Sequence, residues 1–393
     1  MVPPVIIVLL RGVVFCLLCL LPRMALSHDF YVWQRKWDGK VDAAVREELA
    51  NGRHGLYVLG GEIEYEGGRA VWKKVSVPEA LWKDVRVTAV FRLPVKALEN
   101  PARSAQLVVE QAVKLAVRRI QLDVDVPERK LGKYAELVAA LRSNPSWTFE
   151  SVGATFLPCH LPCKEIRKTL ALIDEPVIQL HGIDAPKHRD AGWRLMNRKT
   201  AFAALKAAGR LDARFKMALP TYAYVLFFNE DGSFRRLFAE GLGDGDFPVG
   251  ADASREIAAP DLELLHEIIT STDSLPVIWF RFPVKDHDRW ALAMETILAL
   301  ERGELPKPGL DVEMRAQDSK VVDVLATYRH QIPLKDVEVA LDWVAETRGE
   351  FFPMNGTRIA DGSAYGALPE RVLVAPHAPG QSFIIGKAIK ESK

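Results

Sequence analysis

Short apolar runs recur along the first three quarters of the chain, with longer stretches between them in which apolar residues return every three or four positions. The runs are rich in Val, Ile and Phe, and several lack a clean alternation of apolar and polar residues. This pattern is typical of parallel strands that are covered by helices. It predicts eight strands, at residues 30–34, 56–64, 85–92, 119–126, 149–157, 177–184, 215–224 and 277–283.

Helical spacing is found between most of these runs, at residues 105–117, 131–141, 166–173, 200–208, 262–269 and 290–300. Eight strand–helix units in about 275 residues match the size of a (β/α)8 barrel of the TIM type. A doubly wound open sheet is the alternative. Its Gly-rich phosphate loop is missing, because the first strand-to-helix turn has only Gly60 and Gly61, and Glu62 follows where a phosphate would be repelled. We therefore predict the α/β class and a barrel domain at residues 28–305.

The pattern changes after Gly303, where Pro306, Pro308 and Gly309 form a stiff linker. Strand-like segments separated by turn residues follow, with no long helix, at residues 312–315, 321–327, 337–343, 371–375 and 383–388. This predicts a small, all-β, sandwich-like domain at residues 310–393, whose simplest role is to pack against the barrel.

The first 27 residues form a separate segment. Arg11 precedes an apolar run from Val13 to Leu21, and small residues at Ala25 and Ser27 suit a signal peptidase. We predict a signal peptide at residues 1–27, cleavage before His28, and a protein that is exported to the periplasm or secreted. An uncleaved N-terminal anchor is the alternative, but Arg11 would lie within its apolar segment. After cleavage, no membrane span is predicted.

Charge and cysteine content limit which partners, disulfides and metal sites the chain can have. With 52 Lys and Arg against 51 Asp and Glu, the formal net charge is +1, so nothing favours nucleic acid as a partner. After signal cleavage Cys159 and Cys163 remain, as a short-loop disulfide or as two thiols under a loop. A metal site that includes His160 is a third reading, but three ligands within five residues do not make the usual four-ligand pattern. We predict neither a metal nor a cofactor.

The fourth predicted strand carries the strongest candidate chemistry. Its side chains alternate, so Gln121, Asp123 and Asp125 share one face, and both carboxylates point into the mouth of the predicted barrel. The two aspartates are roughly 6.5–7 Å apart along the strand, so their mutual repulsion should raise one pKa and separate acid and base roles. The alternative is structural: one aspartate caps the next helix and the other binds an arginine such as Arg92 or Arg281.

Polar and aromatic residues also lie at other predicted strand ends, where a barrel places its reactive groups. They are Glu62 and Glu64 on the second strand, Gln179 and His181 on the sixth, Tyr222 and Tyr224 on the seventh, and Trp279 and Arg281 on the eighth. Each has a plain structural alternative: the glutamates can be solvated loop residues, His181 a core histidine, and Trp279 a core side chain.

Taken together, these groups predict a carbohydrate site. Aromatic faces pack on the apolar faces of pyranose rings, while carboxylates and amides bind hydroxyl groups. A glycosidase needs one carboxylic acid over the leaving oxygen and a second group opposite or below the ring. We assign Asp125 as the acid and Glu62 or Asp123 as the second group. Gln121, Gln179, His181, Tyr222, Trp279 and Arg281 are the predicted substrate-binding residues.

Three segments also resemble a family of bacterial exported proteins known as domain of unknown function 3142. They are residues 30–37 (FYVWQRKW), residues 120–127 (IQLDVDVP) with Leu131 and Tyr134 after them, and residues 218–222 (ALPTY). The family name implies no activity.

A more distant resemblance is to chitinase-type glycoside hydrolase barrels, which carry an Asp-x-Asp-x-Glu pattern at the end of the fourth strand. Asp123 and Asp125 match its two aspartates, but Pro127 stands where the final Glu is expected, and Glu128 is one residue late. A shift of one residue on a strand turns a side chain to the opposite face. The departure argues against acetamido-assisted hydrolysis of chitin unless the chain bends at Pro127.

The leading hypothesis is therefore an exported glycoside hydrolase-like barrel that hydrolyses or binds a polysaccharide through the carboxylates of strand four. The rival hypothesis, which Pro127 favours, is a non-catalytic carbohydrate-binding or envelope scaffold protein. A metal-dependent deacetylase on a similar barrel is a third class, and it predicts metal in the purified protein.

Overall fold

The structure is a computed structural model that describes residues 28–390, except 147, 183–184, 239–254, 273–274, 285–286, 288–290, 307–309, 319, 329–336, 342–348, 362, 365–366 and 375–381. The predicted signal peptide, residues 1–27, lies outside the described residues. Within the described part of the chain, no helix has both the length and the apolar character needed to cross a membrane.

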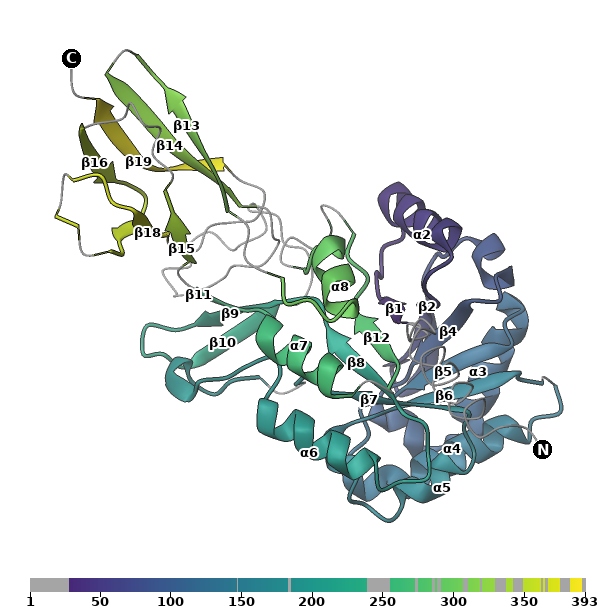
Figure 1. The fold of residues 1–393 in the computed structure, drawn as a ribbon. Coiled ribbons are helices and arrows are strands. Elements are labelled where there is room, and N and C mark those ends of the chain that lie inside the picture. The colour runs from purple at the N-terminus through teal and green to yellow at the C-terminus, as the bar shows by residue number, and fades with distance from the viewer. Residues whose placement is uncertain are drawn as a thin grey trace, which may run out of the picture.

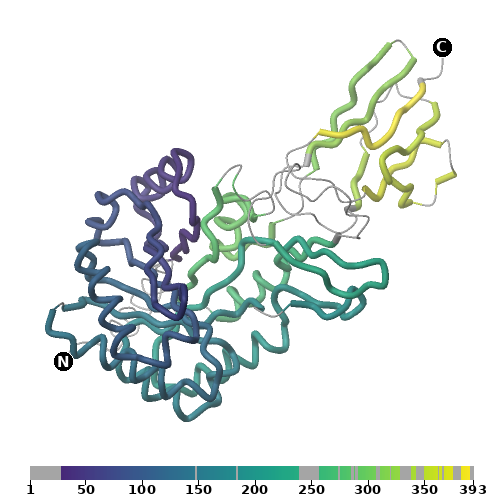
Figure 2. The backbone as a smooth tube through the Cα atoms, turned by 180° about the vertical axis from the view of Figure 1, so that it is seen from behind, coloured from purple at the N-terminus to yellow at the C-terminus, as the bar shows by residue number. Residues whose placement is uncertain are grey.

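Eight parallel strands form a closed ring, shown in Figures 1 and 2. The ring closes because β1 pairs in parallel with both β2 and β12. In ring order the strands are β1 (Asp29–Val32), β2 (Leu56–Glu66), β4 (Val87–Arg92), β5 (Arg119–Asp123), β6 (Ser151–Phe156), β7 (Glu175–Gln179), β8 (Lys216–Pro220) and β12 (Val277–Phe280). Each corresponds to one of the predicted strands, and the predicted (β/α)8 barrel is confirmed.

Helices cover the outside of the ring (Figure 1). They are α2 (Gly39–Asn51), α3 (Pro101–Leu115), α4 (Leu131–Arg142), α5 (Ile166–Leu170), α6 (Arg198–Ala208), α7 (Leu262–Ser271) and α8 (Met294–Glu301). Short 3-10 helices occupy Glu79–Lys83, Val95–Glu99, Glu128–Lys130, Pro158–His160 and Arg189–Ala191. Helix α2 was not predicted, because only Val41 and Val45 form its buried apolar stripe. The residues that mark this helix are its caps. The Asp38 side chain accepts hydrogen bonds from two backbone N–H groups at the start, and Gly52 ends the helix in the left-handed region.

Two antiparallel additions interrupt the repeating pattern. Strand β3 (Arg69–Lys74) forms a hairpin with the long end of β2. Strands β9 (Tyr224–Phe228), β10 (Phe234–Phe238) and β11 (Arg255–Ala258) form a separate sheet after β8. Neither was predicted. The apolar run that contains β8 continues into β9, so hydrophobicity alone does not show that the chain leaves the barrel after Pro220.

Residues 310–390 contain two antiparallel sheets, which Figures 1 and 2 show apart from the barrel. One has the order β13 (Leu310–Ala316), β14 (Val321–Tyr328), β19 (Ser382–Lys390), β16 (Gly349–Pro353). The other has the order β15 (Val337–Ala340), β18 (Arg371–Val374), β17 (Arg358–Ile359). Val324, Phe351 and Val372 are buried in a core of their own. Gly386 permits this packing, because a Cβ there would overlap the Phe351 ring. The predicted all-β C-terminal region is confirmed.

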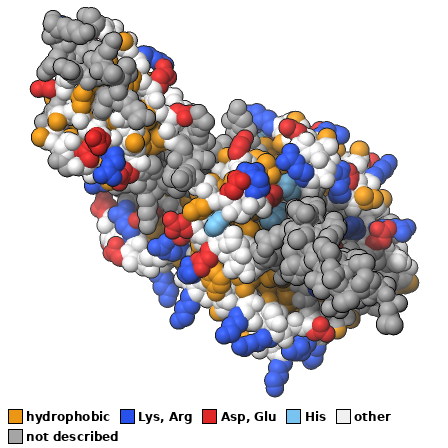
Figure 3. Space-filling view, in the orientation of Figure 1, with side chains coloured by type: hydrophobic (Ala, Val, Ile, Leu, Met, Phe, Trp, Pro, Cys, Tyr) orange, Lys and Arg blue, Asp and Glu red, His pale blue; other side chains and the backbone are white. Residues whose placement is uncertain are grey.

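The alternation of side chains along β5 shows how the barrel positions its functional groups. Ile120 and Leu122 are fully buried in the main core, and the Tyr134 hydroxyl of α4 donates to the Leu122 carbonyl oxygen at 3.1 Å. Gln121 and Asp123 point to the opposite face, into the barrel interior. Among the described residues, side chains of both charge signs are visible on the face of the molecule shown in Figure 3.

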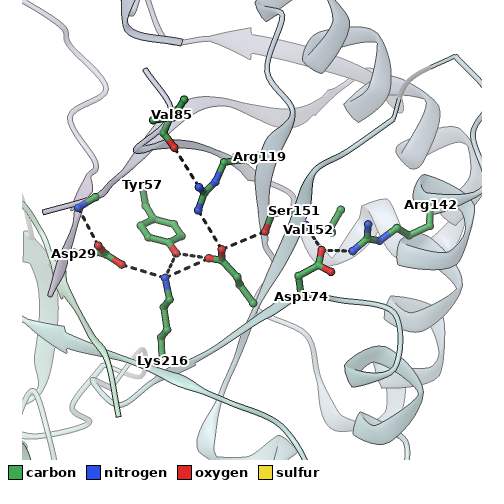
Figure 4. Close-up of polar contacts among 11 residues, drawn as sticks. Asp29, Tyr57, Val85, Arg119, Arg142, Ser151, Val152, Asp174 and Lys216 are labelled. Carbon is green, nitrogen blue, oxygen red and sulfur yellow. Dashed lines mark hydrogen bonds and ion pairs between the residues drawn. The ribbon is translucent and has the colours of Figure 1, made fainter. Parts of the chain in front are cut away.

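A polar network closes the end of the barrel where the strands begin (Figure 4). Lys216 Nζ lies 3.1 Å from Asp29 Oδ2, 3.4 Å from Glu175 Oε2 and 2.7 Å from the Tyr57 hydroxyl oxygen. Arg119 Nη2 lies 3.3 Å from Glu175 Oε1. Burial acts to raise the pKa of Glu175, but Lys216, Tyr57 and Arg119 outweigh it and lower that pKa. Because charged groups fill this end, the functional site is expected at the opposite end, where the strands finish.

Replacing the central cation of this network should destabilise the protein. Lys216→Met leaves Asp29 and Glu175 partly buried without their shared cation, and we expect a loss of about 2–4 kcal/mol in the free energy of unfolding. Urea unfolding at neutral pH measures the loss. Lys133→Met is the matched control, because Lys133 forms an exposed pair with Glu136 and should contribute less than about 1 kcal/mol. Equal effects of the two substitutions would contradict a structural role for the network.

Candidate functional site

A cavity of ≈ 250 Å³ lies at the end of the barrel where the strands finish. Seven of the eight barrel strands, or the segments directly after them, contribute to its wall; β2 does not. The lining residues are Tyr31, Trp33, Arg35, Arg92, Asp123, Asp125, Thr155, Gln179, His181, Ala218, Tyr222, Tyr224, Phe280 and Arg281. Six of the nine predicted site residues are therefore together in this cavity, namely Asp123, Asp125, Gln179, His181, Tyr222 and Arg281.

The two aspartates occupy different depths of the cavity. Strand β5 ends at Asp123, whose side chain is 13% exposed, whereas that of Asp125, in the segment that follows, is 43% exposed. Val124 and Val126 between and after them are buried, so the alternation continues beyond the strand. Asp125 therefore stands at the mouth of the cavity, and Asp123 lies below it.

Burial is the main influence on the pKa of Asp123. The loss of hydration raises its pKa to about 6, and the negative charge of Asp125 adds to this. The Thr155 hydroxyl donates to Asp123 Oδ1 at 2.9 Å, and Arg92 Nε lies 3.9 Å from Asp123 Oδ2; both favour the ionised form but do not outweigh burial. Asp123 is thus a carboxyl group that changes its protonation state near pH 6, inside a cavity.

Arg92 links the aspartates to Glu62. Its guanidinium lies 3.9 Å from an oxygen of Asp125 and 3.2 Å from Glu62 Oε1. Arg35 binds the same glutamate in a bidentate manner, with N–O distances of 3.0 and 3.1 Å. Burial acts to raise the pKa of Glu62, but the two arginines lower it. Glu62 does not line the central cavity. It lines a neighbouring cavity of ≈ 460 Å³ with Arg35, Arg92 and Asp125.

The wall opposite the aspartates is mainly aromatic. His181 stacks on Phe280, with ring centroids 5.0 Å apart. Burial lowers the pKa of His181 to about 3, so its imidazole carries no charge at neutral pH. Its Nδ1 lies 3.2 Å from the Tyr222 hydroxyl oxygen and 3.4 Å from Gln179 Nε2. The Tyr222 hydroxyl in turn donates to that of Tyr224 at 3.2 Å. This chain of contacts fixes the orientation of several polar groups on one side of the cavity.

Two predicted binding residues lie elsewhere. Trp279 is fully buried on the outer face of β12, and its indole Nε1 donates to Glu301 Oε1 of α8 at 2.8 Å. Alternation on β12 instead places Phe280 in the cavity, with Arg281 after it. Gln121 is fully buried in the barrel interior, one pleat below Asp123, and does not line the cavity. For Trp279, the structural alternative in the sequence was the correct one.

Sequence reasoning missed several lining residues. Trp33 and Arg35 follow β1 at alternate positions after Tyr31, and all three line the cavity. Thr155 and Phe280 lie on β6 and β12. The signal that could have found them is the same alternation that identified Asp123 and Asp125, applied to every strand. Arg92 had been considered only as a structural partner for an aspartate.

The segment with the cysteines lies beside the site. Cys159 and Cys163 are free thiols, and the Cys163 thiol donates to the Cys159 carbonyl oxygen at 3.4 Å. His160 is fully buried and binds backbone groups through both ring nitrogens. Across the described residues, no group of three or more His, Cys, Asp or Glu side chains could hold a metal ion. Glu128 begins a 3-10 helix after Pro127 and does not reach the central cavity.

Comparison with known proteins finds the family expected from the sequence over the middle of the chain. Residues 90–285 match the family described as Domain of unknown function (DUF3142). The matched range includes residues 120–127 and 218–222, whereas residues 30–37 precede it. No curated protein matches the chain.

Solved structures of chitinase-type barrels resemble the chain at low sequence identity. The spore cortex-lytic enzyme SleL of Bacillus cereus has a TM-score of 0.49 and 9% identity, over 72% of this chain and 75% of that one. A chitinase from Chromobacterium violaceum has a TM-score of 0.48 and 11% identity, over 70% of this chain and 98% of that one. The chitinase ChiA74 from Bacillus thuringiensis has a TM-score of 0.45 and 8% identity, over 93% of this chain and 85% of that one.

The raised pKa of Asp123 predicts a stability cost at neutral and alkaline pH. A carboxyl whose folded-state pKa is about 6, against roughly 3.9 when unfolded, favours folding below the unfolded pKa and loses that contribution as the pH rises through 6. At pH 8 the free energy of unfolding of Asp123→Asn should therefore be about 3 kcal/mol higher than that of the natural protein. Urea unfolding at pH 8 and pH 4.5 tests this, and the difference should fall to about a third at the lower pH. A gain that is the same at both values would contradict the assignment.

Proposed function

We propose that this protein is an exported glycoside hydrolase that cleaves a polysaccharide, with Asp125 and Asp123 at its centre. The observation that carries the proposal is the coupled pair of aspartates in a cavity at the end of the barrel, one exposed at the mouth and one buried with a pKa of about 6. Enzymes of this fold place their reactive groups at this end, and general acids work best with a pKa near the operating pH.

The depths of the two aspartates support different roles. Asp125 lies at the mouth, where it can deliver a proton to the oxygen of the leaving sugar. Asp123 lies below, where its carboxylate faces the ring whose bond is cleaved. Below about pH 6 the buried Asp123 carboxyl holds a proton. Asp125 gives a proton to the leaving oxygen and receives that of Asp123, so the glycosidic bond breaks and two carboxylates remain. They stabilise the positive charge on the sugar until water adds to it and returns a proton to Asp123.

Glu62 does not suit the role of second catalytic group. Two arginines hold it at N–O distances of 3.0–3.2 Å, outside the central cavity. Its role in this proposal is to orient Arg35 and Arg92 beside the aspartates. Asp123 therefore takes the second role among the described residues.

The rest of the cavity suits a sugar ring. Trp33, Tyr224 and Phe280 offer aromatic faces, and Gln179 and Arg281 offer hydrogen-bond donors for hydroxyl groups. The rival function, a carbohydrate-binding or scaffold protein without catalysis, shares this surface. A protein that only binds carbohydrate would not need a carboxyl pair that holds one proton.

Incubation with a panel of polysaccharides distinguishes the two functions. We expect the release of reducing ends from at least one glycan, and a loss of at least about 100-fold in kcat/KM for Asp125→Asn, the usual scale for a general acid. Asp190→Asn is the control, because that side chain is 84% exposed and is not among the residues of the cavity. Glycan binding without turnover, unaffected by Asp125→Asn, would support the scaffold function instead.

The pH profile provides a separate test. Because Asp123 is protonated below about pH 6, the pair holds its proton only in acid, and kcat/KM should fall as the pH rises through 6. In Thr155→Val the hydroxyl that favours the ionised form is lost, so the fall should move to higher pH. Initial rates between pH 4 and pH 9 measure both. A profile without an inflection near pH 6 would argue against the pair as the proton source.

A further inference from the structure

A second cavity, of ≈ 650 Å³, opens beside the central one. It lies among the segments that follow β5, β6 and β7 and the start of α6. Asp125 and His181 line both cavities, so the two share these side chains in their walls. We refer to it as the apolar cavity.

The lining of the apolar cavity differs in chemistry from that of the central one. Val126, Leu180 and Leu195, which are buried, line it, together with the charged side chains of Glu128 and Arg194. Trp193 is half-buried in its wall, and its ring centroid lies 5.8 Å from that of Tyr224, which lines the central cavity. Polar side chains, including Asn197, complete the lining. A large aromatic face with polar groups around it is what one face of a pyranose ring requires.

The wall that the two cavities share is held in place by His160. This fully buried side chain lies between the segments after β5 and β6. Its Nδ1 accepts from the Leu157 backbone N–H at 3.0 Å, so its Nε2 carries the proton and donates to the Val126 carbonyl oxygen at 2.6 Å. Burial lowers the pKa of His160, which keeps the ring neutral. The residue after Asp125 is thereby fixed, and with it this part of the wall between the cavities.

Asp125 also lines the charged cavity on its other side, with Arg35, Arg92 and Glu62. It is therefore the residue that the three neighbouring cavities have in common. A group in the apolar cavity would meet the central cavity at Asp125. The group proposed to protonate the leaving oxygen thus stands between two compartments, each of which can hold part of a ligand.

We propose that the apolar cavity is the leaving-group subsite of this hydrolase and binds a pyranose ring on Trp193. The inference rests on the proposed function, because it takes Asp125 as the proton donor. The scissile bond then lies beside Asp125, with one sugar in the central cavity and the next in the apolar cavity. With sugar sites on both sides of Asp125, the enzyme would cleave bonds between two sugars inside a glycan chain.

Titration calorimetry on Asp125→Asn, which should bind without turnover, tests this subsite. The probes are linear β-1,4-linked oligosaccharides of two to six glucose or N-acetylglucosamine units. We expect affinity to increase with length until both cavities are filled. Adding Trp193→Ala should then lower the affinity for the longer oligosaccharides about tenfold, the scale of one aromatic stacking contact. Trp193→Phe should restore most of it. Trp72→Phe, in a half-buried tryptophan on β3 that contacts Phe91, is the control and should change nothing.

The outcomes separate the subsite from the proposed function. Unchanged affinity for long oligosaccharides in Trp193→Ala, with the thermal unfolding of the variant intact, overturns the subsite alone. Binding that depends on Trp193, in a protein that releases no reducing ends, supports the ring site on Trp193 and overturns only hydrolysis. A protein that neither binds these probes nor cleaves any glycan overturns both.

Discussion

The closure of the parallel sheet is the constraint on which the rest of the structure depends. Once β1 pairs with both β2 and β12, every strand has one face toward the helices and one toward the interior. Every second residue of one strand then lies in the interior, at positions that run from the buried middle of the barrel to its open end. Gln121, Asp123 and Asp125 follow this path, with rising exposure. The same constraint turns Trp279 outward to α8 and Phe280 into the cavity.

The two ends of the barrel use charge in opposite ways. Where the strands begin, Lys216 and Arg119 compensate Asp29 and Glu175, and the pKa of Glu175 is lowered. Where the strands finish, the shared arginine is closer to Glu62 than to the aspartates, and Asp123 keeps a raised pKa. A compensated network stabilises the fold, whereas a partly compensated carboxyl retains a proton that it can transfer.

Much of the barrel could be predicted because each strand is a short apolar run followed by helical spacing. The predictions failed where a segment lacked that contrast: α2 has a thin apolar stripe, and β9 continues the run of β8. Within the site, six of the predicted strand-end residues line the central cavity. Glu62 and Trp279 show the limit of that reasoning, since a strand end can be engaged by arginines or turned toward a helix. Asp184, in the sixth predicted strand, lies outside the described residues.

Local hydrophobicity and the two-residue period of a strand were enough to predict where the barrel strands lie along the chain, the all-β character of the C-terminal region, and the common face of Asp123 and Asp125. Which partners surround that face depends on how the barrel closes. Arg92, Thr155 and His181 come from three different parts of the chain and line the same cavity as Asp123, whose raised pKa depends mainly on burial. Burial and charge pairing act across space, between residues that no local pattern connects.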